Sequence, residues 1–247
     1  MADTPVYAIL GATGGIGSAL TRSLAATGAR LALGARSVDK LRDLAGETGA
    51  AAYTLDATKL TGVESFVQSV LDQYGRLDGI ANCVGSIILK PAHLTSAEEF
   101  EETLRLNLHS AFYVVKTCTK VMQKQKSGSI VLVSSIAAHY GLQNHEAIAA
   151  AKGGVASLVR AAAASYAHRG VRVNAVSPGL VRTPMAARLT ASEQAEKQSA
   201  SMHPLGRIGE PEDVAPMIHH LLDAEKSGWI TGQVISVDGG FATVKPR

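Results

Sequence analysis

The sequence predicts an α/β protein of the doubly wound, Rossmann-like class, with about seven parallel strands and helices on both faces of the sheet. Two observations lead to this expectation. Short apolar runs alternate with longer amphipathic stretches along the chain, and the first apolar run leads directly into a glycine-rich turn. One domain over residues 1–247 is expected, because no linker, long charge run or internal repeat divides the sequence.

Strands are expected where apolar runs are short and, in several cases, apolar on both faces, as a buried parallel sheet requires. In chain order they are residues 6–10, 30–33, 52–55, 79–82, 129–133, 171–176 and 234–237. Helical periodicity covers residues 16–26, 38–47, 63–74, 98–125, 144–168 and 212–222. Ser37 and Thr61 are suitable helix N-caps. Ligands of such sheets bind at the carboxyl ends of the strands, where the strand order reverses.

Composition and charge exclude several classes of function. A chain that is 46% hydrophobic and 18% charged is too apolar to be disordered. The net charge of +3 is spread along the chain and aromatic residues make up only 4%, so no nucleic-acid partner is expected. No run approaches the roughly 20 apolar residues of a membrane span. Because the first strand begins by Val6, we expect no cleaved leader and a cytoplasmic protein.

The cysteine and histidine residues show no metal-binding pattern. Cys83 and Cys118 lack metal or redox spacing, and both are expected to be reduced packing residues. His219 and His220 have no third ligand nearby in the sequence, so no metal site is predicted.

The first turn reads Leu-Gly-Ala-Thr-Gly-Gly-Ile-Gly over residues 10–17. Glycines at such a turn let the backbone approach a pyrophosphate closely, and the N-terminus of the following helix offers free N–H groups and a positive dipole end. The turn therefore predicts a dinucleotide site.

The end of the second strand predicts which dinucleotide binds. An NAD enzyme places a carboxylate there, whereas a 2′-phosphate requires a cation. The sequence has Ala35 at the acidic position, followed by Arg36 and Ser37, and a guanidinium is a good phosphate ligand. NADP is therefore expected rather than NAD, the alternative being that Arg36 is a solvated loop residue.

Further motifs, in order over nearly the whole chain, resemble the short-chain dehydrogenase/reductase family. Gly11, Gly15 and Gly17 fit its glycine turn, with Leu10 replacing the usual threonine and Gly14 standing where NADP-preferring members often have a basic residue. Other matches are Asp56-Ala57 after the third strand, the run Asn82-Cys83-Val84-Gly85, Asn107, Ser134-Ser135, Lys152, Ser177-Pro178-Gly179 with Thr183, and residues 237–240.

The resemblance implies roles for these residues. Expected cofactor-binding residues are Gly11, Thr13, Gly15, Ile16, Gly17, Arg36, Ser37, Asp56, Ala57, Asn82, Gly85, Lys152, Pro178, Gly179 and Thr183. Expected catalytic residues are Asn107, Ser135 and Lys152. The resemblance also implies a mobile substrate lid around residues 183–201, and a homotetramer or homodimer with helices 98–125 and 147–167 in the contact.

One departure changes the expected chemistry. The family places a tyrosine four residues before the lysine and thirteen after the serine, and both Lys152 and Ser135 fix that position as Ile148. Isoleucine has no proton to give, and losing a positioned general acid typically costs about 10²- to 10⁴-fold in rate. Cofactor binding should survive, because in the family the lysine also holds the nicotinamide ribose.

Several explanations remain open. His145 lies seven residues before Lys152, within about 20° of the same helical face, and is one candidate for a substitute acid. Tyr140, His139 and water are others, and His145 is alternatively a pocket or helix-start residue. A pre-protonated imine would need no acid. The sequence thus predicts an NADP-dependent oxidoreductase acting on a small carbonyl or imine substrate, or alternatively a catalytically impaired dinucleotide-binding protein, either a sensor or an inactive partner subunit.

Overall fold

A seven-stranded parallel sheet organises the chain in the computed structural model, which describes residues 4–244. The strand order is β3-β2-β1-β4-β5-β6-β7. The strands are β1 (Val6–Leu10), β2 (Arg30–Ala35), β3 (Ala51–Thr54), β4 (Gly79–Asn82), β5 (Gly128–Val133), β6 (Val171–Pro178) and β7 (Val234–Val237). This confirms the predicted doubly wound class, and β1, β4 and β7 have the predicted bounds.

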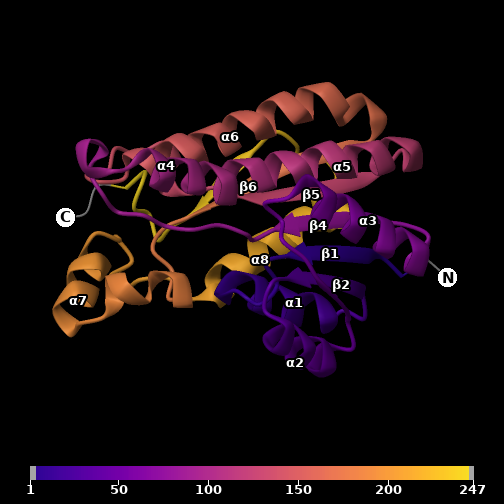
Figure 1. Ribbon diagram of the computed structural model, residues 1–247, viewed down its shortest axis with the longest axis horizontal. Helices are drawn as coiled ribbons and strands as arrows, with labels where there is room; N and C mark the ends of the chain where they lie inside the picture. Colours follow the sequence, from indigo (N-terminus) through magenta and orange to yellow (C-terminus); the bar gives the residue numbers. More distant parts are fainter. Residues whose placement is uncertain (1–3, 245–247) are drawn as a thin grey trace.

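Helices cover both faces of the sheet (Figure 1). The helices are α1 (Gly15–Ala25), α2 (Val38–Thr48), α3 (Leu60–Tyr74), α4 (Ala97–Leu104), α5 (Ser110–Gln125), α6 (Glu146–Tyr166), α7 (Glu193–Ser201), α8 (Pro211–Leu222) and α9 (Ala224–Ser227). Buried side chains of α3, α5 and α6 form a hydrophobic core on one face, and those of α1, α2 and α8 form a second core on the other. The alternating faces of the strands supply both cores.

The strand order places two loops side by side at one edge of the sheet. Leu10, at the end of β1, pairs with Gly34 on one side and with Asn82, at the end of β4, on the other. The chain leaves β1 toward β2 and β3, then returns to add β4 on the opposite side. The turns after β1 and β4 therefore flank the point where the strand order reverses, which is where sheets of this type bind ligands.

The predicted helix over residues 98–125 is interrupted. The structure has α4 and α5 joined by a π-helical segment, Arg105–His109, which holds the buried Asn107. One-turn π segments inside α-helices occur frequently at functional sites. The expectation of a single regular helix was wrong at this turn, because an extra residue per turn is not visible in apolar spacing.

Three other helices differ from the predictions in part. Thr61 lies inside α3, whose N-cap is Lys59, while Ser37 is the N-cap of α2 but its side chain makes no cap hydrogen bond. Residues 146–169 are long and apolar enough to cross a bilayer by length and composition alone, contrary to the expectation that no stretch approaches this. Half of the most apolar 18 residues of that stretch are buried, and α6 packs on β6 as a core helix.

Candidate active site

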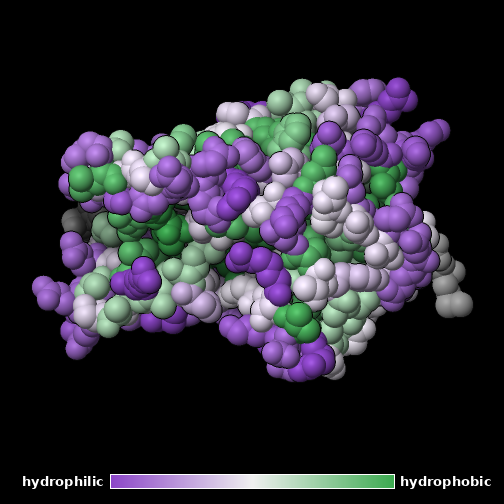
Figure 2. All heavy atoms as spheres, in the orientation of Figure 1, coloured by the Kyte–Doolittle hydropathy of each residue, from purple (hydrophilic) through white to green (hydrophobic). Residues whose placement is uncertain are grey.

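A cavity of about 320 Å³ opens at the carboxyl edge of the sheet. Four loops and two helices surround it: the glycine turn after β1, the loops after β4, β5 and β6, the start of α2, and α6. Its walls include Thr13, Gly14, Gly15, Ile16, Gly17, Ser37, Lys40, Cys83, Val84, Gly85, Ser86, Ile87, Asn107, Ser135, Ile148, Lys152, Pro178, Gly179, Leu180, Thr183 and Met185. Figure 2 shows apolar atoms gathered in the hollow between the layer of α4 and the lobe that carries α7.

The glycine turn has the geometry that a dinucleotide requires. Gly11 has φ 72°, a left-handed conformation that disfavours other residues, and a Cβ there would lie 2.8 Å from the Cys83 carbonyl carbon. A Cβ on Gly17 would overlap the Gly11 carbonyl oxygen. Helix α1 begins at Gly15 with neither a side-chain cap nor an acidic residue in its first turn. The positive end of α1 is thus open to an anionic ligand, as phosphate binding requires.

Lys152 and Ile148 share one face of α6 and line the cavity. Both are buried, with exposed fractions of 6% and 3%. The Lys152 ammonium donates to the Val133 carbonyl at 2.7 Å. Burial lowers the pKa of Lys152 from its ordinary value of 10.5 to about 8, a shift that the nearby Cys83 slightly opposes. Isoleucine therefore occupies the position at which the family resemblance places a tyrosine, and an ammonium with a pKa of about 8 lies one turn away.

Ser135 offers a hydroxyl to the cavity. It is the N-cap of a short 3₁₀ turn, and its Oγ accepts a hydrogen bond from the Ala137 amide at 3.2 Å. Because the oxygen accepts, the hydroxyl hydrogen is available to a ligand, and within residues 4–244 no acceptor for it is seen. Ser135 can therefore polarise a substrate oxygen.

Asn107 has a positioning role. Its Nδ2 donates to Ser86 Oγ at 3.0 Å and to the Thr103 carbonyl at 2.9 Å, while its Oδ1 accepts from the Ser86 amide at 3.2 Å. Both amide hydrogens of Asn107, an expected catalytic residue, are thus engaged within the protein. A Cβ on Gly85 would lie 2.8 Å from Asn107 Oδ1. The asparagine thus holds the loop after β4 against the π segment that joins α4 and α5.

Two cations, Arg36 and Lys40, lie at the end of β2 and the start of α2. Arg36 and Ser37 are exposed at the end of β2, and Ser37 lines the cavity together with Lys40, which sequence reasoning missed. A lysine in the first turn of a helix opposes the helix dipole, a signal that could have identified Lys40. Asp56 lies close enough for the Arg36 charge to lower its pKa, although the main cause is a hydrogen bond from the Thr58 hydroxyl.

Two predicted cofactor residues act within the protein. Asn82 is 2% exposed, its Nδ2 donates to Ser110 Oγ at 3.2 Å, and its Oδ1 accepts from the Val84 amide at 3.2 Å. The Ala57 side chain lies in the core beneath α3. Neither side chain lines the cavity, so Asn82 braces the loop after β4 and Ala57 packs beside the site.

The proposed substitute acids do not line the cavity. His145 precedes α6 with φ −109° and ψ 13°, and its Nδ1 lies 2.7 Å from the Gln143 carbonyl oxygen. Because His145 is not helical, the face shared with Lys152 that its spacing indicated does not exist. Tyr140 is 46% exposed and packs edge-on against Phe241, with ring centroids 5.6 Å apart. His139 Nε2 lies 2.9 Å from a serine hydroxyl on β6.

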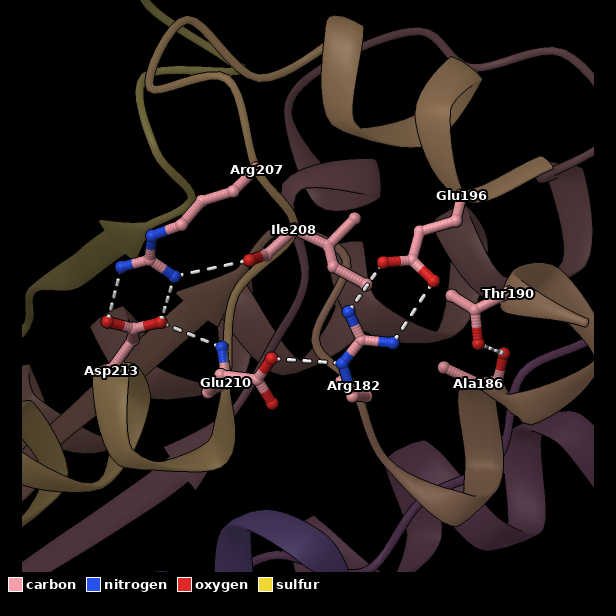
Figure 3. Close-up of polar contacts among 8 residues, drawn as sticks. All are labelled: Arg182, Ala186, Thr190, Glu196, Arg207, Ile208, Glu210 and Asp213. Carbon is pink, nitrogen blue, oxygen red and sulfur yellow. Dashed lines mark hydrogen bonds and ion pairs between the residues drawn. The ribbon is translucent and has the colours of Figure 1, made fainter. Parts of the chain in front are cut away.

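Residues 183–201, the predicted lid, form a 3₁₀ segment, Pro184–Thr190, followed by α7. Arg182 joins this segment to the body of the protein: it donates to Glu196 on α7 at 2.7 Å and to Glu210, the N-cap of α8, at 2.9 Å. Arg207 pairs with Asp213 beside it (Figure 3). These are exposed ion pairs, which typically contribute about 0–1 kcal/mol each.

The fold and the site define a dinucleotide-binding α/β protein, and comparison with known proteins identifies the family. A family profile described as "Enoyl-(Acyl carrier protein) reductase" matches residues 11–242. The chain belongs to the short-chain dehydrogenase/reductase family, and its fold and sequence are those of the NAD(P)-dependent reductases within it.

Three relatives illustrate the similarity. The chain is 37% identical to the 3-oxoacyl-[acyl-carrier-protein] reductase FabG of Thermotoga maritima over 243 residues, covering 96% of this chain and 97% of the relative. It is 36% identical to the short-chain dehydrogenase/reductase aba4 of Botryotinia fuckeliana, covering 96% of each. The crystal structure of a variant of actinorhodin polyketide ketoreductase with NADPH superimposes with a TM-score of 0.93, at 29% identity and 98% coverage of both chains.

Proposed function

We propose that the protein is an NADP-dependent oxidoreductase that reduces a small carbonyl or imine substrate at a site without the family's tyrosine. The observation that carries the proposal is the meeting of three features at one cavity: the open glycine turn, the Ser135 hydroxyl and the buried Lys152 ammonium. When bound, NADPH supplies a hydride. The glycine turn and the free end of α1 would hold its pyrophosphate, and Lys152 would hold the nicotinamide ribose.

Charge at the adenosine end supports NADP over NAD. Arg36 and Lys40 flank Ser37, and no carboxylate stands at Ala35 to accept hydrogen bonds from ribose hydroxyls. The names of relatives also support a carbonyl substrate, since FabG and the actinorhodin enzyme are called a 3-oxoacyl reductase and a ketoreductase. An imine substrate remains part of the proposal, because Ile148 gives the cavity an apolar wall and a pre-protonated imine needs no acid.

The test combines binding with turnover. Nucleotide fluorescence measures binding, and we expect the Kd for NADPH to be at least tenfold lower than the Kd for NADH. We also expect NADPH to be consumed with a panel of ketones and matched cyclic imines. Faster reduction of ketones would exclude the imine alternative. Tight NADPH binding without consumption by any substrate would favour the second candidate, a sensor or inactive partner subunit, which Ile148 itself favours. No binding of either nucleotide would refute both.

The proposal also covers the oligomeric state and the cellular location of the protein. We propose a homodimer or homotetramer in which α5 and α6 form the contact, supported by the half-exposed Phe112 on α5. We also propose a cytoplasmic location, with neither membrane nor nucleic-acid partners. Light scattering of the purified protein would test the assembly, and a monomer at micromolar concentration would contradict it.

A further inference from the structure

The cavity contains few groups that could give a proton to a substrate. Among the residues that line it, only Lys40, Cys83 and Lys152 have titratable side chains. Lys40 is exposed at the start of α2, at the adenosine end. Burial raises the pKa of the Cys83 thiol to about 12, so this thiol retains its proton near neutrality. Lys152 is therefore the one lining group that both carries an acidic proton and lies beside Ile148.

The surroundings of Lys152 leave part of its ammonium open to the cavity. Its only hydrogen-bond acceptor among the described residues is the Val133 carbonyl, at 2.7 Å, while an ammonium has three hydrogens. A Cβ on Gly85 would lie 3.5 Å from Lys152 Nζ and 2.8 Å from Asn107 Oδ1. The glycine thus leaves open the approach to Nζ that a side chain would cover, and Asn107 fixes the loop that carries it.

We propose that the Lys152 ammonium is itself the general acid, giving its proton directly to the substrate oxygen in place of the absent phenol. The inference rests on the proposed reductase function. As the carbonyl carbon gains the hydride, the π electrons of the C=O bond move to oxygen. That oxygen then forms an O–H bond with a proton from Nζ, breaking an N–H bond. Ser135 donates a hydrogen bond to the same oxygen, and water reprotonates the neutral amine held by Val133.

The acidity of Lys152 fits this role. Burial lowers its pKa to about 8. No carboxylate among residues 4–244 contributes to this shift. An acid is most effective when its pKa is near the working pH. A lysine with its ordinary pKa would give up its proton about 10²-fold less readily.

The first experiment measures the pKa of Lys152 and requires no turnover of substrate. Competitive acetylation of the cofactor-free protein at a series of pH values, read by mass spectrometry, gives the pKa of each lysine from its rate of labelling. We expect Lys152 to become reactive near pH 8, well below the value of about 10.4 of an unperturbed lysine. Reaction of Lys152 only above pH 10 would overturn the proposal.

The second experiment separates proton donation from cofactor binding. We expect kcat for ketone reduction to fall tenfold per pH unit above about 8. Lys152→Arg keeps a cation that cannot release its proton; its kcat should fall by about 10²- to 10⁴-fold, while its Kd for NADPH changes less than tenfold. The control Lys124→Arg should match the wild type. A Lys152→Arg enzyme with wild-type kcat, or a flat pH profile, would overturn the assignment.

A third variant distinguishes failure of this proposal from failure of the proposed function. Ile148→Tyr restores a phenol four residues before Lys152, and we expect faster ketone reduction with no fall in kcat near pH 8. If the wild type and Ile148→Tyr both reduce ketones but Lys152→Arg keeps the wild-type kcat, this proposal alone is overturned. Turnover by Ile148→Tyr with none by the wild type would overturn both this proposal and the reductase function of the wild type. Absence of NADPH binding in both proteins would refute the proposed function.

Discussion

Replacing Lys152 with methionine is expected to stabilise the protein near neutral pH. Burial lowers the pKa of Lys152 from 10.5 to about 8, so the folded state disfavours the charged form. At about 1.36 kcal/mol per tenfold, this difference corresponds to roughly 3 kcal/mol. Methionine removes the charge but leaves the Val133 carbonyl without its donor, a loss of about 1 kcal/mol. The expected net gain is about 2 kcal/mol.

The pH dependence of this gain has a definite sign. Below pH 8, Lys152 is charged in both the folded and the unfolded chain, and the full penalty applies. Between about pH 8 and 10.5 the folded lysine is neutral while the unfolded chain still binds the proton. The unfolded state then binds more protons, so the stability of the wild type rises with pH. The advantage of Lys152→Met should shrink over that interval.

Urea and thermal unfolding at pH 7, 9 and 10, with the protein concentration held constant, measure both effects. At pH 7 the melting temperature of Lys152→Met should rise by about 4–8 °C. Lys124→Met removes an exposed lysine, and its free energy of unfolding should change by less than about 0.5 kcal/mol. The reasoning is refuted if Lys152→Met is less stable than the wild type at pH 7, or if its advantage is the same at pH 10.

Three other variants test the site and its supports. Gly11→Ala forces a side chain into a left-handed backbone, 2.8 Å from the Cys83 carbonyl carbon. We expect the free energy of unfolding in urea to fall by about 1–3 kcal/mol and NADPH binding, measured by fluorescence, to be lost. Unchanged NADPH affinity would contradict the role of the turn. Arg36→Glu should weaken NADPH binding at least tenfold while NADH binding stays or improves, and an unchanged ratio would show that Arg36 does not contact the phosphate. Arg207 lowers the pKa of Asp213 from 3.8 to about 2. The pair therefore stabilises the fold fully above pH 3.8, and this stabilisation is lost as the pH falls toward 2. In an acid titration Arg207→Gln should unfold at a higher pH than the wild type, and identical acid midpoints would contradict this.

The sheet was predictable because its strands are visible in the local sequence. β1 and β4 are short, buried on both faces and followed by turns, so their bounds followed from apolar runs and glycines. The π turn at Arg105–His109 was not predictable. Nothing in its sequence breaks a helix; the structure instead pairs Asn107 with Ser86, a residue 21 positions earlier. Such a contact belongs to the tertiary structure and leaves no local pattern.

The site was predictable where its residues match motifs that resemble those of the family, and less so elsewhere. Ser135 and Lys152 line the cavity as the family resemblance implied. The argument for His145 was wrong in its geometry, because it applied helical spacing to a residue that lies before the helix begins. Met185 reaches the cavity from the segment after β6, and the length and path of such a segment cannot be read from one sequence.

The two buried cations of the described chain, residues 4–244, show why Lys152 is more than a structural residue. Arg172 is 8% exposed, and its guanidinium donates to the Leu221 and Leu222 carbonyls at the end of α8 and to the Ser227 hydroxyl. Its donors are spread over several acceptors, as the stability of a buried cation requires. Lys152 is equally buried, has a single acceptor and faces a cavity. An ammonium whose remaining hydrogens no group within residues 4–244 accepts can donate them to a ligand in the cavity beside Ile148, as the proposed function requires.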